Sequence, residues 1–196
     1  MTDVRAWMDH GTKLFLTTVE RLGDPELLVP TGLPGWTRRH VVAHVHYNAE
    51  ALRRLVSWAA TGVESAMYAS PEQRAREIEE GARLPADRLR DLVARSAADL
   101  ADDLDGLSAD AWRAEVVTAQ GRRIPATQIP WLRAREVAVH AVDLSAGIDF
   151  ADLPADLVEA LLVDAVTKRA GAGDGPGLAA WLTGRVAQAP TLGPWL

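Results

Sequence analysis

Cysteine is absent from this chain of 196 residues. The protein can therefore form neither a disulfide bond nor a thiolate metal site, and it has no nucleophilic thiol of its own. Any reaction that uses sulfur must take the thiol from another molecule.

Positive charge is scarce as well. Lys and Arg total 21 against 27 Asp and Glu, which gives a formal net charge of -6, and lysine occurs only at Lys13 and Lys168. A chain with this balance and no dense basic cluster lacks the electrostatic footprint for nucleic acid or for an anionic membrane surface. Small molecules are the expected partners, and the sequence favours no particular oligomeric state.

Long apolar runs are also missing. No stretch approaches the roughly 20 residues that cross a bilayer, and residues 1–20 lack the basic start, apolar centre and small-residue cleavage site of a secretory signal. We therefore expect a cytoplasmic protein. Hydrophobic residues make up 48% of the sequence and charged residues 24%, a balance typical of a compact globular fold.

What the sequence does contain is apolar residues at helical spacing, which predicts four principal helices. These cover residues 4–22, a segment capped by Thr37 that ends before Thr61 and Gly62, a charged region of 74–80 plus 87–104, and residues 131–144 with Gly147 as the C-cap.

Shorter signals lie between and after these helices. Ser70 and Pro71 are typical of an N-cap and a first helical residue, whereas Gly81 and Pro85 interrupt the charged region. Other predicted elements are a short hairpin or an extended connection over 114–117 and 122–125, a helix over 154–169, a break over 171–177 and a last helix over 178–183.

Helices joined by loops, with at most one hairpin, favour a mainly α fold and an antiparallel four-helix bundle. Such bundles commonly place metal sites on facing helices. We expect the bundle to occupy residues 1–149 and a short C-terminal region to occupy residues 150–196.

Glu136 and His140 are four positions apart, so on a helix their side chains project from one face about one turn apart. His40 and His44 share this spacing, and the residues alone do not decide which of the two completes a site. Two imidazoles and a carboxylate suit zinc and leave coordination positions open, although iron, nickel or cobalt fit the same set. A surface hydrogen-bonded pair without a metal is the alternative.

Two further polar residues lie near these candidates in the sequence. Asp143, three residues after His140, either supports its imidazole through a hydrogen bond or remains a solvated charge at a helix end. Asn48 follows His44 by about one turn. It either faces the same cavity as a cofactor contact or bonds to the backbone in the bundle core.

Two segments resemble the mycothiol-dependent maleylpyruvate isomerase family, which belongs to the DinB-like bundle superfamily. They are LPGWTRRHVVAHV at 33–45 and WLRAREVAVHAVDL at 131–144. The resemblance extends over about residues 22–196 and implies that His44, Glu136 and His140 are the metal ligands, because His40 falls where the family places none.

The C-terminal region resembles a reduced form of the isomerase C-terminal domain. The resemblance is carried by AWLTGR at 180–185 and GPWL at 193–196. It places Arg185 on a functional arginine of the isomerase, and a surface arginine near a helix end is the alternative.

The resemblance implies a metal-dependent enzyme that uses mycothiol, a low-molecular-weight thiol. A metal favours the thiolate, whose addition to the cis double bond of maleylpyruvate leaves a bond that rotates before elimination gives fumarylpyruvate. Arg185 would then bind a carboxylate. Two alternatives are an S-transferase that joins the thiol to an electrophilic metabolite or toxin, and a non-catalytic metal-binding or regulatory module.

Overall fold

The structure is a computed structural model of the whole chain and describes residues 4–192. It divides into two compact units, Met1–Asp152 and Leu153–Leu196. The first unit contains the three residues expected to bind metal. Residues 193–196, which carry part of the C-terminal resemblance, lie outside the described residues.

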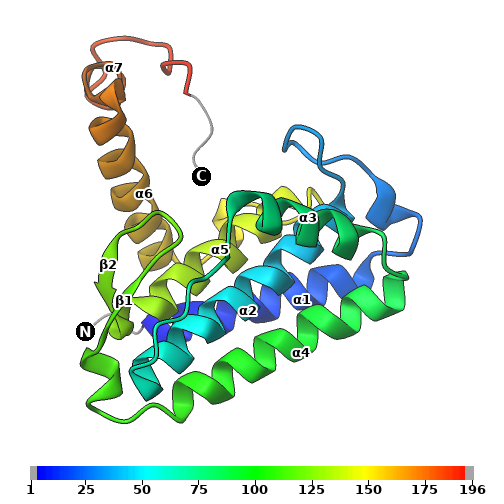
Figure 1. Cartoon of the computed structure of the whole chain (residues 1–196). Helices are drawn as coiled ribbons and strands as arrows, with labels where there is room; N and C mark the ends of the chain where they lie inside the picture. Colours follow the sequence, from blue (N-terminus) through cyan, green and yellow to red (C-terminus); the bar gives the residue numbers. More distant parts are fainter. Residues whose placement is uncertain (1–3, 193–196) are drawn as a thin grey trace. The chain divides into compact units, whose positions relative to one another are not determined.

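The first unit is a bundle of four long helices with a fifth helix beside it (Figure 1). The four are α1 at Val4–Arg21, α2 at Arg38–Thr61, α4 at Ala86–Asp105 and α5 at Ile129–Asp143, and the fifth is α3 at Pro71–Ala82. The expected mainly α bundle is therefore confirmed. Within residues 4–192, no helix is long and apolar enough to cross a membrane.

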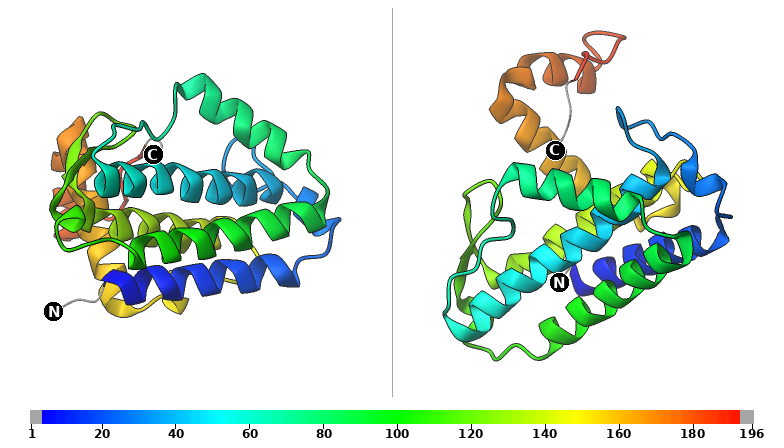
Figure 2. Two further views of the ribbon diagram at one scale, coloured as in Figure 1. Left: turned by 60° about the horizontal axis from the view of Figure 1, so that its bottom comes forward. Right: turned by 45° about the vertical axis from the view of Figure 1, so that its right-hand side comes forward.

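Hydrogen bonds across the bundle show which way its helices run. Arg90, early in α4, donates at 2.7 Å to the carbonyl of Leu22, just past the end of α1. Arg38, the first residue of α2, donates at 2.6 Å to the carbonyl of Leu144, just past the end of α5. Thus α1 is antiparallel to α4, and α2 is antiparallel to α5 (Figure 2).

Two helix starts follow the signals in the sequence. Ser70 accepts a hydrogen bond of 3.2 Å from the backbone N–H of Gln73, and Pro71 is the first residue of α3. Thr37 caps α2, and its backbone N–H donates at 3.1 Å to Nδ1 of His40. The ring of His40 is therefore part of the cap of α2.

Two expectations about the helices need correction. The charged region is two helices, α3 and α4, because Pro85 cannot continue the first one and instead precedes the second. Helix α5 ends at Asp143 with Leu144 as its C-cap, so Gly147, with a φ of 85°, lies in the loop beyond the cap.

A two-stranded hairpin precedes α5, which confirms the hairpin alternative. Strand β1, Glu115–Val117, pairs antiparallel with β2, Arg123–Pro125, and the buried residues Val116 and Ile124 are partners across the ladder. Gly121 in the turn has a φ of 74°, a left-handed conformation that favours glycine.

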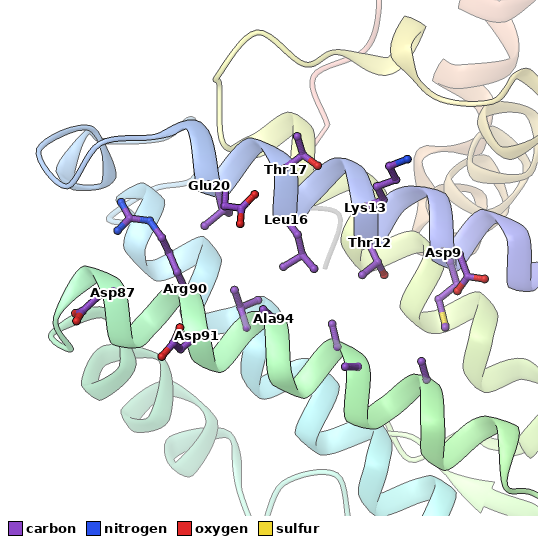
Figure 3. A pocket seen from close by; sticks show the side chains of 16 residues that line it. Asp9, Thr12, Lys13, Leu16, Thr17, Glu20, Asp87, Arg90, Asp91 and Ala94 are labelled. Carbon is purple, nitrogen blue, oxygen red and sulfur yellow. The ribbon is translucent and has the colours of Figure 1, made fainter.

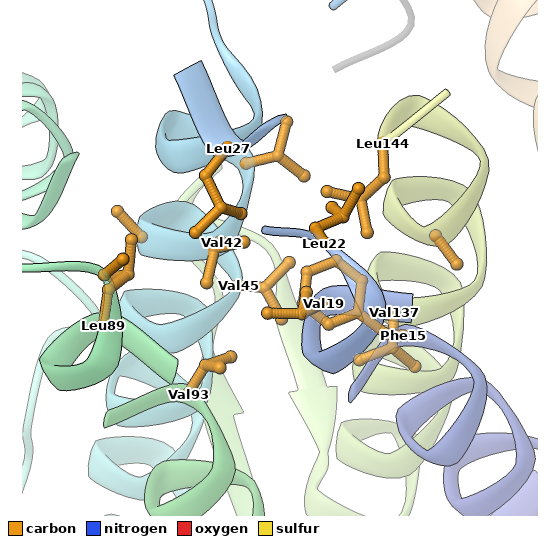
Figure 4. Close-up of a cluster of buried hydrophobic side chains, with 14 residues drawn as sticks. Phe15, Val19, Leu22, Leu27, Val42, Val45, Leu89, Val93, Val137 and Leu144 are labelled. Atoms are coloured by element: carbon orange, nitrogen blue, oxygen red, sulfur yellow. The ribbon is translucent and has the colours of Figure 1, made fainter. Parts of the chain in front are cut away.

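The hydrophobic core of the first unit lies between α1, α2, α4 and α5 (Figure 4). Phe15 of α1, Val45 of α2 and Val137 of α5 are among its fully buried residues. A Cβ atom at Gly11 would lie only 2.7 Å from Cγ2 of Val137, so glycine permits the close approach of α1 to α5. This packing holds in place the helix that carries Glu136.

A surface groove runs between α1 and α4 (Figure 3). Ala94 and Ala97 are among its small lining residues, and Lys13, Glu20 and Arg90 are among its charged ones. All of its lining residues come from α1 and α4, so the groove does not include the metal-ligand candidates of α2 and α5.

Among its described residues, 153–192, the second unit is helical from Ala155 to Leu182. Helix α6, Ala155–Arg169, is followed by a π-helical segment, Ala170–Asp174, and by α7, Gly175–Leu182. Gly173 interrupts the helical backbone with a φ of 101°. The expected helix over 154–169 is confirmed. The expected break over 171–177 needs correction, because residues 170–174 are π-helical and α7 begins at Gly175 with a proline in its first turn. The relation of this unit to an isomerase C-terminal domain stays a prediction.

Candidate metal centre

Side chains from α2 and α5 converge between these two helices. His44 belongs to α2, whereas Glu136 and His140 belong to α5. One nitrogen or oxygen atom from each residue lies within 4.8 Å of the other two, and all three residues are buried. The fold thus brings together side chains that are 92 positions apart in the chain.

Glu136 joins the two histidines. Its Oε2 atom lies 3.0 Å from Nε2 of His44 and 3.4 Å from Nε2 of His140. Ligands of a tetrahedral zinc ion, each about 2.0–2.2 Å from the metal, are about 3.3 Å apart, so these spacings suit one ion. Nε2 of His140 is buried and makes no hydrogen bond to a residue within 4–192, which suits a nitrogen that coordinates.

Asp143 orients the imidazole of His140. Its Oδ2 atom lies 2.8 Å from Nδ1 of His140. A carboxylate that accepts a hydrogen bond from one ring nitrogen directs the other toward a metal and increases its basicity. Of the two roles considered for Asp143, the structure confirms the hydrogen bond.

The two histidines differ in protonation at neutral pH. Burial lowers the pKa of His44 to about 4. Burial also lowers the pKa of His140, but the hydrogen bond with Asp143 and the nearby carboxylate of Glu136 outweigh burial and raise this pKa to about 9. Burial raises the pKa of Glu136, yet its contacts with His140 and His44 outweigh burial and hold the pKa well below its ordinary value. Glu136 is therefore an ionised carboxylate, His44 is a neutral imidazole and His140 is a protonated, positively charged imidazole.

The other histidines of α2 have different surroundings. Nδ1 of His40 takes part in the helix cap, and its Nε2 lies 3.5 Å from Oε1 of Glu79. His46 packs against Tyr47, with their ring centroids 4.7 Å apart. The geometry therefore separates His44 from His40, a choice that spacing alone leaves open.

Two arginines and a tryptophan flank the three-residue group. Nη2 of Arg74, on α3, lies 3.3 Å from Nδ1 of His44, and Nη2 of Arg135 lies 3.5 Å from Oε1 of Glu136. The Trp36 ring centroid is 5.5 Å from that of His44. The sequence does not single out Arg74, because its place beside His44 depends on how α3 packs against α2.

Asn48, the expected cofactor contact, bonds to a buried arginine. Nη1 of Arg133 donates at 2.9 Å to Oδ1 of Asn48 and at 2.8 Å to the carbonyl of Val45. Burial lowers the pKa of Arg133 to about 10, so its guanidinium is still charged at neutral pH. Asn48 therefore supports the bundle interior, and a contact with a cofactor stays a prediction.

Arg185, the expected substrate-binding arginine, lies in the second unit just after α7. Its side chain is exposed, and its guanidinium donates at 2.5 Å to the carbonyl of Thr183. A role in binding substrate stays a prediction.

A helical bundle with two histidines and a carboxylate turned toward one point has the architecture of a metal-binding bundle protein. The family described as the mycothiol maleylpyruvate isomerase N-terminal domain matches residues 8–145. This range covers most of the chain and includes His44, Glu136 and His140. The chain therefore belongs to this family, and the resemblance seen in the sequence is confirmed.

Solved structures of one enzyme are similar to this chain. A crystal structure of the mycothiol-dependent maleylpyruvate isomerase has 42% sequence identity and a TM-score of 0.81, and the similarity covers 83% of this chain and 68% of that chain. A structure of the same enzyme with one histidine replaced by alanine has 41% identity, a TM-score of 0.81 and the same coverage. No curated protein matches the chain.

Proposed function

We propose that this protein is a metal-dependent cis-trans isomerase that acts on maleylpyruvate with mycothiol as its thiol. The observation that carries the proposal is the buried group of His44, Glu136 and His140 in a member of this family. Because the chain has no cysteine, the sulfur has to come from a cosubstrate.

We assign His44, Glu136 and His140 as the ligands of one divalent ion, and zinc is the ion we expect. When bound, a metal supplies positive charge that favours a thiolate, and addition and expulsion of that thiolate exchange a cis for a trans double bond. The residues of the chain prepare the site for the metal. Asp143 holds the ring of His140 through a contact of 2.8 Å, and Glu136 is ionised, so both residues are oriented or charged as metal ligands require.

The proposed function is tested by following maleylpyruvate after zinc and mycothiol are added separately and together. We expect conversion to the trans isomer only when both are present, with no net consumption of the thiol. Accumulation of a thiol adduct would identify an S-transferase instead. If neither product formed although zinc bound, the metal-binding module would be the better account.

Zinc affinity should depend on pH through His140. Its proton has to leave before Nε2 can bind a metal, whereas His44 is already neutral. Between the two pKa values, about 4 and about 9, the affinity should therefore rise by about tenfold per pH unit and level off above about pH 9. Competition with a chelator of known affinity measures this slope. A slope of zero would show that His140 carries no proton in the metal-free protein.

Replacing Arg185 by Ala should lower turnover by about tenfold to a hundredfold, because an arginine that binds a carboxylate contributes a charged hydrogen bond. Zinc content should stay the same, since Arg185 is not one of the assigned ligands. Steady-state kinetics and elemental analysis of the same samples measure both quantities. Arg122→Ala, which removes another exposed arginine, is the control, and equal rates for the two variants would exclude Arg185 from the reaction.

A further inference from the structure

Arg74 is a positively charged residue beside the metal-ligand candidates, and the side chains it contacts there, His44 and Tyr68, are neutral. Its Nη2 atom lies 3.3 Å from Nδ1 of His44, and its guanidinium carbon lies 5.9 Å from the centre of the Tyr68 ring. Within residues 4–192, no carboxylate lies within ion-pair distance of Arg74. Arg53, by contrast, pairs with Glu50 and two further carboxylates. The charge of Arg74 is therefore available to an anion.

The bond from Arg74 also fixes which nitrogen of His44 carries hydrogen. A guanidinium has only donors, so Nδ1 of His44 accepts and carries no hydrogen. The hydrogen of the neutral ring is then on Nε2, which lies 3.0 Å from Oε2 of Glu136. This is the nitrogen that faces the other two candidate ligands.

Metal ligation requires the opposite arrangement of hydrogen on His44. A nitrogen that binds a metal uses its lone pair, so a neutral imidazole bound through Nε2 carries its hydrogen on Nδ1. An N–H of Arg74 would then point at an N–H of His44. The hydrogen bond seen here and ligation through Nε2 therefore exclude each other.

We infer that Arg74 is a substrate-binding residue: ligation of His44 through Nε2 releases its guanidinium, which then binds a carboxylate of the substrate. The inference rests on the proposed function, because maleylpyruvate carries carboxylates. A planar guanidinium offers two parallel donors to such a group. The zinc-free protein keeps Arg74 on His44, so it should bind a carboxylate more weakly.

The release of Arg74 needs no movement of helix α3. A Cβ atom at Gly81 would lie 2.9 Å from Cβ of Ala43, so the backbones of α3 and α2 are in close contact. Arg74 is half-buried and lies earlier on α3, with a long side chain that can turn away from His44. Rotation of this side chain alone therefore exchanges the imidazole for a carboxylate.

The experiment measures binding of maleate, without thiol, by calorimetry in the wild type, Arg74→Gln and Arg76→Gln, each with and without zinc. With zinc bound, Arg74→Gln should weaken maleate binding by about tenfold to a hundredfold, because a charged hydrogen bond is lost. Without zinc the same change should have little effect. Arg76→Gln is the matched control, since Arg76 is exposed on the same helix, and it should bind maleate like the wild type.

A spectroscopic measurement tests the cause directly. Nitrogen-15 shifts of His44 should show hydrogen on Nε2 in the zinc-free protein and on Nδ1 in the zinc-bound protein. Equal maleate affinity of zinc-bound wild type and Arg74→Gln, or an Nδ1 without hydrogen in the zinc-bound protein, would overturn this inference alone. Failure of the wild type to bind zinc through His44 would overturn the proposed function as well.

Discussion

Zinc affinity falls by more than about a hundredfold when either His44 or His140 is replaced by Ala, because loss of a residue that merely orients a ligand already costs about 10–100-fold. Each variant leaves only two of the three assigned ligands, with the carboxylate still buried. We expect thiol-dependent isomerisation to disappear in both variants. Titration against a chelator of known zinc affinity measures the loss.

His40→Ala is the matched control for both variants, because His40 lies on the same helix as His44. Its ring bonds to the backbone N–H of Thr37 and lies near Glu79, so its removal affects the start of α2 and spares the assigned ligands. Zinc affinity should therefore stay close to that of the wild type. A large loss in His40→Ala together with full affinity in His44→Ala would show that the wrong histidine has been assigned.

Arg133→Ala lowers the free energy of unfolding by about 2–5 kcal/mol, because each buried acceptor that loses its donor costs about 1–3 kcal/mol. Arg133 is 1% exposed, and its loss leaves Oδ1 of Asn48 and the carbonyl of Val45 without this donor. The variant also opens a cavity in the interior, which adds to the loss. Urea denaturation of the zinc-free protein measures the change.

Arg122→Ala, at an exposed position in the hairpin turn, is the control and should change the free energy of unfolding by less than about 0.5 kcal/mol. Arg133→Met fills most of the volume of the arginine without its donors. The difference between Arg133→Met and Arg133→Ala therefore reports the cavity. If all three variants unfolded at the same urea concentration as the wild type, the bonds of Arg133 would contribute nothing to stability.

The parts of the fold that the sequence predicts are those with local causes. Thr37 caps α2, and Ser70 with Pro71 starts α3, because capping and a fixed φ act within a few residues. The cap of α5 differs from the expectation, because Gly147 is a typical C-cap residue but Leu144 takes that position. The packing that ends a helix is less visible in the sequence than the residue types that begin one.

The site likewise contains residues that the sequence predicts and residues that only the packing of the helices brings together. Glu136 and His140 are visible from their spacing on one helix, whereas His44 equals His40 in spacing and is singled out only through the resemblance to a family. The neighbours of the group depend on contacts between helices. The approach of Arg74 to His44 and the bond from Arg133 to Asn48 join elements that are 30 and 85 positions apart, so no local pattern reveals them.

The bond from Arg133 has a consequence for the alignment of α2 with α5. The buried faces of these helices are rich in alanine and valine, which present similar surfaces at each turn, so apolar packing alone discriminates poorly against a slide of about 5.4 Å. The guanidinium meets the carbonyl of Val45 and Oδ1 of Asn48 in one register only. The 3.0 Å separation of Nε2 of His44 and Oε2 of Glu136 joins the two helices and requires that register, because a binding site loses its geometry when it shifts by more than about 0.5 Å. The buried charge of Arg133 therefore aligns His44 with Glu136 and His140 before any ion binds.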